Sequence, residues 1–419
     1  MYPVRAEPIQ NQSITVPGSK SYTHRIFIAA ALADGASTVV NALDSEDTRL
    51  TLQALVQMGA GAQKSDTVVI AGFGGRPQPC TEPIYLGNSG TSIRLLTGIA
   101  ALGSGRYRLT GTERMGQRPI ADLLEGLSQI GVAARSELNN GCPPLELEGG
   151  TISGQRLQIA CRESSQYLSS LLLLAPCTRK GLDITVVGDP VSKPYIDMTV
   201  TIMERFGIEV RRDKYRRFTV AGGQRYQPGT YVVEPDCSQA SYFWGAAAIS
   251  GASIKVKAIT QESGQGDLRL VRVLAEMGCK VVYEEDGITL TGNALHGITV
   301  DMGDMPDMVP TLAVVAAYAQ GQTVIRNVAH LHGKESDRLQ AMAAELSKMG
   351  IDARSGDSDL VITGGRPQGV EIETYDDHRI AMSFAVAGLK APGTIIRNPG
   401  CVAKSFPRFW EVLETLYAR

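Results

Sequence analysis

Residues 274–292 read LAEMGCKVVYEEDGITLTG and carry the pattern that decides the fold. The segment begins as an amphipathic helix, reaches Gly278, and continues as an apolar-alternating strand, a turn and a second strand. The same pattern recurs four more times, at residues 55–72, 127–150, 202–223 and 346–365. Its glycines are 71 to 76 residues apart: Gly59, Gly131, Gly207, Gly278 and Gly350. This spacing predicts a repeated folding unit, and residues 406–419 would be a sixth helix without its strands.

A second, more apolar helix lies between these elements. It has Ser, Asn or Asp near its start, at Ser19, Asn88, Ser164, Ser238, Asp304 and Asp376. A glycine follows its end, at Gly35, Gly105, Gly181, Gly251, Gly321 and Gly393. Because both series share one period, we expect six units of about 70 residues, each βαβαββ. Three-unit globules are more plausible than a thin solenoid, so the prediction is an α/β protein of two domains.

Composition limits the possible partners. Among 419 residues, 41 Lys and Arg face 43 Asp and Glu, and the net charge of −2 argues against nucleic acid or an anionic membrane. No apolar stretch approaches about 18 residues, and the start MYPVRAEPIQNQ does not read as a signal peptide, so we expect a cytoplasmic protein. The seven cysteines form no C-x-x-C pair, and His330 and His332 form only a lone H-x-H. We therefore expect reduced thiols, no metal and no cofactor.

Cations gather near the starts of the apolar helices. Pro17-Gly18-Ser19-Lys20-Ser21 leads into a helix with Arg25, and Gly87-Asn88-Ser89-Gly90-Thr91 leads into one with Arg94. Neither motif is a P-loop, and each alone reads more often as a helix cap beside a solvated base. Further cations near helix starts or adjoining loops are Arg118, Lys334, Arg338, Arg379 and Lys404. Helix N-termini attract anions, so the set predicts a site for phosphate and carboxylate groups between the two domains.

Ten ordered segments carry a family resemblance. They are VPGSKSYTHRIFIAAAL, LGNSGTSIRLL, QRPIADLLEGL, ESSQYLSSLLLLAP, SKPYID, EPDCSQASYFWGAAAI, DMPDMVPT, GKESDRLQAM, YDDHRIAMSFAVAGL and CVAKSFPRFWEVL. Over nearly its full length the chain resembles the 5-enolpyruvylshikimate-3-phosphate (EPSP) synthase family of enolpyruvyl transferases. The resemblance implies a two-domain inside-out α/β barrel with three βαβαββ units per domain. Residues 1–18 and 236–419 would form one domain and residues 19–235 the other, with the active site in the cleft between them.

The implied reaction transfers the enolpyruvyl group of phosphoenolpyruvate to the 5-hydroxyl of shikimate 3-phosphate and releases phosphate. Both substrates are polyanions, which explains the many Arg and Lys residues. By resemblance, the shikimate 3-phosphate residues would be Lys20, Ser21, Arg25, Ser164, Ser165, Gln166, Ser192, Tyr195, Asp307, His330 and Lys334. The phosphoenolpyruvate residues would be Lys20, Asn88, Gly90, Arg118, Gln166, Arg338, Arg379 and Lys404, with Gly90 leaving room for the substrate.

Addition and elimination require a base for the 5-hydroxyl and an acid for the enol methylene. Asp307 and Glu335 match the family positions for these roles, and Lys20 would share the proton transfers. Without the resemblance, Asp307 reads as a helix N-cap and Glu335 as a surface residue beside Lys334.

Several positions depart from the family pattern. His330 stands where the family usually has Asn, although an imidazole can still donate one hydrogen bond. Ser92, Ile93 and Leu95 stand where Ala, Met and Pro are usual. The family is the target of glyphosate, and these three differences leave the response of this chain open.

Three alternatives stay open. UDP-N-acetylglucosamine enolpyruvyl transferase shares the fold, but it has a reactive Cys where this chain has Glu113. RNA 3′-phosphate cyclases share related units, but they would need a nucleotide-linked His and a basic RNA face. A non-catalytic shikimate-phosphate-binding paralogue would keep the fold without the reaction. We expect a monomer, because no coiled-coil heptads or amphipathic tail appear.

Overall fold

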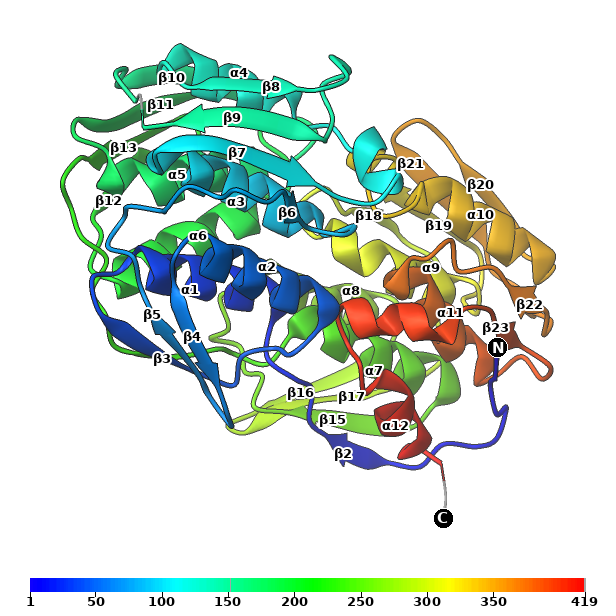
Figure 1. Ribbon diagram of the computed structural model, residues 1–419. Helices are drawn as coiled ribbons and strands as arrows, with labels where there is room; N and C mark the ends of the chain where they lie inside the picture. Colours follow the sequence, from blue (N-terminus) through cyan, green and yellow to red (C-terminus); the bar gives the residue numbers. More distant parts are fainter. Residues whose placement is uncertain (151, 418–419) are drawn as a thin grey trace. The chain divides into compact units, whose positions relative to one another are not determined.

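The computed structural model describes residues 1–150 and 152–417, which fold into two compact units (Figure 1). Unit 1 comprises Met1–Pro17 and Glu234–Arg419, and unit 2 comprises Gly18–Val233. Each unit contains its own cluster of buried hydrophobic side chains. Each therefore has the core that a separate domain needs.

Unit 2 contains three repeats, each built from four strands and two helices. The first has β14 (Thr230–Val232), α1 (Lys20–Leu32), β3 (Ala36–Val40), α2 (Glu46–Gln57), β4 (Gly61–Lys64) and β5 (Val68–Ala71). The second has β6 (Ile84–Tyr85), α3 (Gly90–Leu102), β7 (Gly105–Thr110), α4 (Ala121–Gln129), β8 (Ala133–Ser136) and β9 (Leu145–Gly149). The third has β10 (Arg156–Ala160), α5 (Gln166–Leu174), β11 (Gly181–Val187), α6 (Lys193–Arg205), β12 (Val210–Asp213) and β13 (Arg217–Ala221).

Unit 1 repeats the plan. Its first repeat has β2 (Gln12–Ile14), α7 (Cys237–Ser250), β15 (Ser253–Lys257), α8 (Leu270–Glu276), β16 (Lys280–Glu284) and β17 (Gly287–Thr291). The second has β18 (Thr299–Asp301), α9 (Val309–Ala316), β19 (Gln322–Arg326), α10 (Arg338–Lys348), β20 (Asp352–Ser355) and β21 (Asp359–Thr363). The last has β22 (Glu371–Ile372), α11 (His378–Gly388), β23 (Ile395–Ile396) and α12 (Phe409–Glu414), and β1 (Tyr2–Pro3) completes its sheet. The sixth copy thus ends in a helix, as the sequence predicts.

The five complete repeats share one sheet topology. In the third repeat of unit 2 the strand order is β10-β11-β13-β12. β10 runs parallel to β11, with Leu157 opposite Ile184, and β13 is antiparallel to both of its neighbours. A helix can therefore connect the two parallel strands, and a hairpin connects the last two. The mixed α/β fold with six repeats is confirmed.

Two of the sheets take their first strand from a distant part of the sequence. β2 pairs in parallel with β15, placing Ser13 opposite Lys255 in unit 1. β14 pairs in parallel with β3, placing Tyr231 opposite Val39 in unit 2. The chain enters unit 2 after Pro17 and leaves it after Val233. As a result β2 is far in sequence from α7, the first helix of its repeat, and β14 is far in sequence from α1, the first helix of its own repeat.

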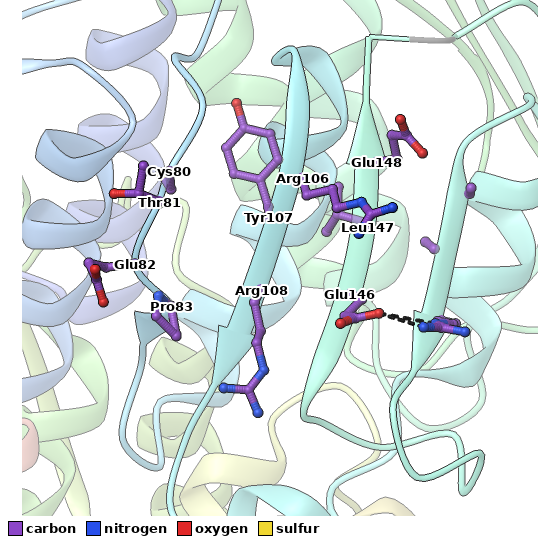
Figure 2. A pocket seen from close by; sticks show the side chains of 13 residues that line it. Cys80, Thr81, Glu82, Pro83, Arg106, Tyr107, Arg108, Glu146, Leu147 and Glu148 are labelled. Atoms are coloured by element: carbon purple, nitrogen blue, oxygen red, sulfur yellow. Dashed lines mark hydrogen bonds and ion pairs between the residues drawn. The ribbon is translucent and has the colours of Figure 1, made fainter.

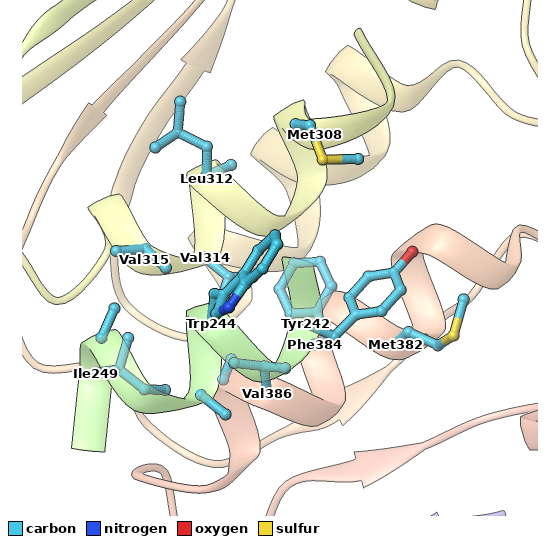
Figure 3. Packing of buried hydrophobic residues seen from close by; sticks show 14 of the residues in the cluster. Tyr242, Trp244, Ile249, Met308, Leu312, Val314, Val315, Met382, Phe384 and Val386 are labelled. Atoms are coloured by element: carbon cyan, nitrogen blue, oxygen red, sulfur yellow. The ribbon is translucent and has the colours of Figure 1, made fainter. Parts of the chain in front are cut away.

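The apolar helices lie at the centre of each unit, and the sheets pack outside them. Every residue of α11 is buried, and so is every residue of α7 except Ser250. Figure 3 shows Trp244 of α7 packed among side chains of α9 and α11. A Cβ atom at Gly245 would lie 2.9 Å from Cγ2 of Thr311, so glycine permits this close approach of α7 to α9.

The periodic glycines have a common conformational reason. All eleven adopt positive φ: Gly35, Gly59, Gly105, Gly131, Gly181, Gly207, Gly251, Gly278, Gly321, Gly350 and Gly393. Each follows a helix and reverses the chain into a strand, a conformation that side-chain-bearing residues adopt at a cost. The repeat is thus visible in the sequence because its turns need glycine.

No helix within the described ranges combines the length and the apolar character that crossing a membrane requires.

Candidate functional site

In unit 2, the predicted residues lie at the starts of the central helices and in adjoining loops. Ser19 caps α1, and its side chain accepts a hydrogen bond from the backbone N–H of Tyr22. Lys20 begins the helix, and its Nζ lies 3.0 Å from Oδ2 of Asp47 in the first turn of α2. Asp47 is buried, so this ion pair fixes a cation at the start of α1.

Arg25 lies one turn further along α1 and is held by neutral oxygens. Its Nε donates to Oγ1 of Thr199 at 2.7 Å, and its Nη1 donates to the carbonyl of Ser21 at 3.0 Å. Its Nη2 donates to the carbonyl of Tyr195, whose ring centre lies 6.0 Å from the guanidinium. Burial lowers the pKa of Arg25 to about 10. The contacts join three predicted residues: Ser21, Arg25 and Tyr195.

The start of α3 approaches that of α5 through side chains. Nη1 of Arg94 donates to Oε1 of Gln166 at 3.1 Å, and Nε2 of Gln166 donates to Oγ1 of Thr91 at 2.9 Å. The backbone N–H of Gln166 donates to Oγ of Ser164, and Ser165 is buried just before the helix. Arg94 therefore orients the amide of Gln166, a residue expected to reach both substrates.

Arg118 packs directly on Gly90. Its Nη1 donates to the carbonyl and to Oδ1 of Asn88, at 2.6 and 3.0 Å. A Cβ atom at Gly90 would overlap the guanidinium of Arg118. Glycine at position 90 therefore permits the close approach of the Arg118 guanidinium.

Ser192 precedes α6 with φ 55°, a left-handed conformation that turns the chain into the helix carrying Tyr195. Non-glycine residues pay a strain cost there, and such positions concentrate at functional sites.

In unit 1, Arg338 joins three carboxylates. Its Nε donates to Oδ2 of Asp377 at 2.8 Å and its Nη1 to Oδ1 of Asp307 at 2.9 Å. Its Nη2 donates to Oε2 of Glu335 and, at 3.3 Å, to Oδ1 of Asp377. The guanidinium is fully buried; burial opposes its charge, yet the three carboxylates raise the pKa of Arg338. Both carboxylates predicted to transfer protons, those of Asp307 and Glu335, therefore form ion pairs with Arg338.

Arg379 holds the other side of Asp307. Its Nη2 lies 2.7 Å from Oδ2 of Asp307 and 3.2 Å from Oγ of Ser238. Burial alone would raise the pKa of Asp307, but the guanidinium groups of Arg379 and Arg338 outweigh it and hold that pKa well below the ordinary value. Asp307 lies in the 3-10 helix Pro306–Met308 and is not the N-cap of α9, which corrects one interpretation of the sequence.

Three more predicted residues of unit 1 are His330, Lys334 and Lys404, and the charge of Lys334 also lowers the pKa of Asp307. His330 is buried in the 3-10 helix Ala329–Leu331, and burial together with the charge of Lys334 lowers its pKa to about 3. His330 is therefore neutral at physiological pH. Lys404 is buried at the end of the 3-10 helix Pro399–Lys404, which packs on α11.

A metal-like cluster occurs at the same place. Ligand atoms of Glu335, Asp377 and His378 lie within 4.8 Å of one another. Arg338 already donates to both carboxylates, so a cation there would meet a buried guanidinium. The arrangement fits an Arg-centred ion cluster better than a metal site.

A pocket of about 560 Å³ lies against strands β7, β8 and β9 and the segment before β6 (Figure 2). Charged side chains line it, including Arg106, Arg108 and Glu148, and Glu146 bonds to Arg135 across the strands. None of the predicted site residues lines this pocket. Cross-strand charge pairs are ordinary on the exposed face of a sheet.

Sequence reasoning missed Asp47 and Asp377. Both lie at the starts of helices: Asp47 follows the N-cap Ser45 of α2, and Asp377 caps α11 by accepting from the backbone N–H of Arg379. Acidic residues at helix starts are usually interpreted as caps. Their second role is visible only in space, where Asp47 pairs with Lys20 and Asp377 pairs with Arg338.

Comparison with known proteins identifies the family. A family model described as EPSP synthase (3-phosphoshikimate 1-carboxyvinyltransferase) matches residues 5–413. The chain belongs to this family.

Relatives and solved structures agree. A 3-phosphoshikimate 1-carboxyvinyltransferase of Syntrophobacter fumaroxidans is 44% identical over 98% of both chains, and one of a Marinomonas species is 42% identical over 97% of both. The structure of EPSP synthase from Acinetobacter baumannii superposes with a TM-score of 0.83 at 30% identity, covering 99% of this chain and 98% of that one. The enolpyruvyl transferase NikO from Streptomyces tendae, at 20% identity and a TM-score of 0.77 over 99% and 96%, shares the fold. The protein is a carboxyvinyl transferase of the shikimate pathway, which supplies aromatic amino acids.

Proposed function

We propose specific roles for the residues of this EPSP synthase family member in transferring the enolpyruvyl group of phosphoenolpyruvate to the 5-hydroxyl of shikimate 3-phosphate. The observation that carries the proposal is the Asp307 carboxylate bridging Arg338 and Arg379, with Glu335 on the same Arg338 guanidinium. It brings anion-binding cations and proton-transfer carboxylates within hydrogen-bonding distance of one another.

Shikimate 3-phosphate binds mainly through unit 2. Lys20, Ser21, Arg25, Ser164, Ser165, Gln166, Ser192 and Tyr195 supply donors and cations at helix starts, and unit 1 adds Asp307, His330 and Lys334. Helix N-termini and Lys or Arg side chains suit a sugar phosphate. His330 is neutral, so it contributes a hydrogen bond without charge.

Phosphoenolpyruvate binds through Arg338, Arg379 and Lys404 of unit 1 and through Lys20, Asn88, Gly90, Arg118 and Gln166 of unit 2. In the structure Asp307 and Glu335 occupy guanidinium donors that an anionic substrate would need. The two carboxylates stand in for the substrate anion. A bound substrate anion would also pair with Arg338 and Arg379, so these guanidinium groups would stabilise the Asp307 carboxylate less. The pKa of Asp307 would then rise from its depressed value toward one suited to proton transfer.

The reaction then proceeds by addition and elimination. One carboxylate takes the proton of the 5-hydroxyl as the hydroxyl oxygen bonds to C2 of phosphoenolpyruvate. The other group, in its protonated carboxylic acid form, gives a proton to the C3 methylene. In the second step C3 loses a proton and phosphate leaves from C2, which forms the C2=C3 double bond of the enol ether product. Asp307 and Glu335 fill these roles, and Lys20 assists the proton transfers.

The test is phosphate release from phosphoenolpyruvate by the purified protein. We expect release with shikimate 3-phosphate and none with UDP-N-acetylglucosamine. Release with the nucleotide sugar alone would assign the sister reaction. Tight shikimate 3-phosphate binding without release would indicate a binding paralogue and remove the catalytic roles.

We also propose that the enzyme is a monomer located in the cytoplasm. All seven cysteines are free thiols, which supports a reducing compartment. Light scattering of the eluting protein should give one mass near 44.8 kDa.

A further inference from the structure

The loop before α11 adopts an unusual conformation. Tyr375 and Asp376 are consecutive non-glycine residues with φ of 53° and 54°. Left-handed residues of this kind cost free energy and persist only where surrounding contacts hold them. The next residues are Asp377, which contacts Arg338, and Arg379, which contacts Asp307. The loop therefore sets the position of two residues of the site.

Helix α10 forms hydrogen bonds with this loop at two places. Arg338, at the start of α10, holds Asp377 at the downstream end of the loop. Glu345 lies seven residues later, about two turns along the same face. Its Oε1 accepts from the hydroxyl of Tyr375 at 2.7 Å, and its Oε2 accepts from the backbone N–H of Glu373 at 3.1 Å.

The Glu345 side chain is fully buried, and Lys348 balances its charge at 2.7 and 2.9 Å. A buried carboxylate persists when it is paired and hydrogen-bonded. It accepts from a hydroxyl and a backbone N–H of the same loop, so it ties two points of that loop to a rigid helix. The downstream end is also fixed, because the backbone N–H of Asp377 donates to the carbonyl of Thr374 at 2.8 Å.

We propose that Glu345 is a positioning residue for the phosphoenolpyruvate-binding cations of unit 1. By anchoring Tyr375 and Glu373 it maintains the left-handed turn, which presents Asp377 to Arg338 and starts α11 so that Arg379 reaches Asp307. Glu345 touches no substrate in this scheme. The inference rests on the proposed function for its effect on catalysis, but the anchoring itself does not depend on that function.

The experiment compares Tyr375→Phe, which deletes one hydrogen bond to Glu345, with Tyr283→Phe on β16. The two tyrosines are 39% and 38% exposed, so the pair matches in chemistry and exposure. We expect Tyr375→Phe to raise the KM for phosphoenolpyruvate about tenfold, as for loss of a hydrogen bond to a charged group, with the KM for shikimate 3-phosphate within about twofold. Tyr283→Phe should match the wild type. Glu345→Gln should show the same selective rise in KM.

Hydrogen exchange separates the inference from the proposed function. The backbone amides of Asp377 and Arg379 should exchange about tenfold faster in Tyr375→Phe, because their acceptors depend on the turn. If the wild type proves inactive but these amides respond, the anchoring stands and the proposed function falls. If the wild type is active and Tyr375→Phe changes neither amide exchange nor the KM for phosphoenolpyruvate, the positioning role is overturned.

Discussion

Arg25 in unit 2 and Arg338 in unit 1 are each 1% exposed, yet their surroundings shift the pKa in opposite directions. Burial among neutral oxygens lowers the pKa of Arg25 to about 10. Arg338 is equally buried, but Asp377, Glu335 and Asp307 raise its pKa. A buried cation without carboxylate contacts is poised to take an external anion, whereas one surrounded by carboxylates is already neutralised. Under the proposed function, Arg25 binds substrate without a carboxylate partner, whereas Arg338 binds substrate beside the carboxylates that would transfer protons.

The largest expected effect tests the proton-transfer role in unit 1. Glu335→Gln keeps the shape and a hydrogen-bonding oxygen for Arg338 but cannot carry the proton. We expect turnover to fall by about 10² to 10⁴ while shikimate 3-phosphate binding stays within a few-fold. Steady-state kinetics and calorimetric titration measure the two quantities. Parallel loss of turnover and binding would make Glu335 structural.

Replacing either buried arginine, Arg338 or Arg25, by methionine should lower the free energy of unfolding, and by different amounts. Arg338→Met leaves three carboxylates clustered around an uncharged side chain, and we expect a loss of about 3 to 5 kcal/mol in the free energy of unfolding. Arg25→Met leaves only carbonyl and hydroxyl oxygens unsatisfied, which should cost about 1 to 3 kcal/mol. Urea unfolding of both variants gives the comparison. Equal losses would show that the carboxylates around Arg338 do not matter to stability.

Lys20 of unit 2 differs from Arg25 because it pairs with a buried carboxylate, that of Asp47. Lys20→Ala should weaken binding of both substrates by about tenfold or more, since a phosphate would lose a charge-assisted partner. Lys20→Arg keeps the charge and should recover part of the affinity. A change in thermal stability with unchanged binding would remove Lys20 from the site.

The smallest effect concerns His330 and pH. Its pKa falls from 6.5 to about 3 on folding, so the folded protein resists a proton that the unfolded chain accepts. The stability that His330 contributes is present above pH 6.5 and is lost as pH falls toward 3, at about 1.4 kcal/mol per pH unit. Because the unfolded imidazole is only half protonated at pH 6.5, the wild type should lose about 1 kcal/mol of unfolding free energy relative to His330→Asn between pH 6.5 and pH 5.5. Parallel pH profiles for the two proteins would mean that His330 is charged or exposed.

The sequence alone determined the repeat, and with it the fold class. Eleven glycines mark turns that need positive φ, so the local backbone conformation can be predicted from the sequence. Apolar helices alternate with amphipathic ones, so the burial of the helices can be predicted as well. The motifs at the helix starts also predicted cations for the proposed site, namely Lys20, Arg25, Arg338 and Arg379.

The partners of these cations, and of the Tyr375 loop, come from elements that are far apart in the sequence. Asp47 and Asp377 look like ordinary acids at helix starts, and Glu345 looks like one of many charged residues on an amphipathic helix. Their partners lie 27, 39 and 30 residues away in sequence. A one-dimensional pattern records the period of a helix or strand but not which side chains meet across elements. The raised pKa of Arg338 depends on such contacts, because electrostatic interactions in the interior depend on distance and burial.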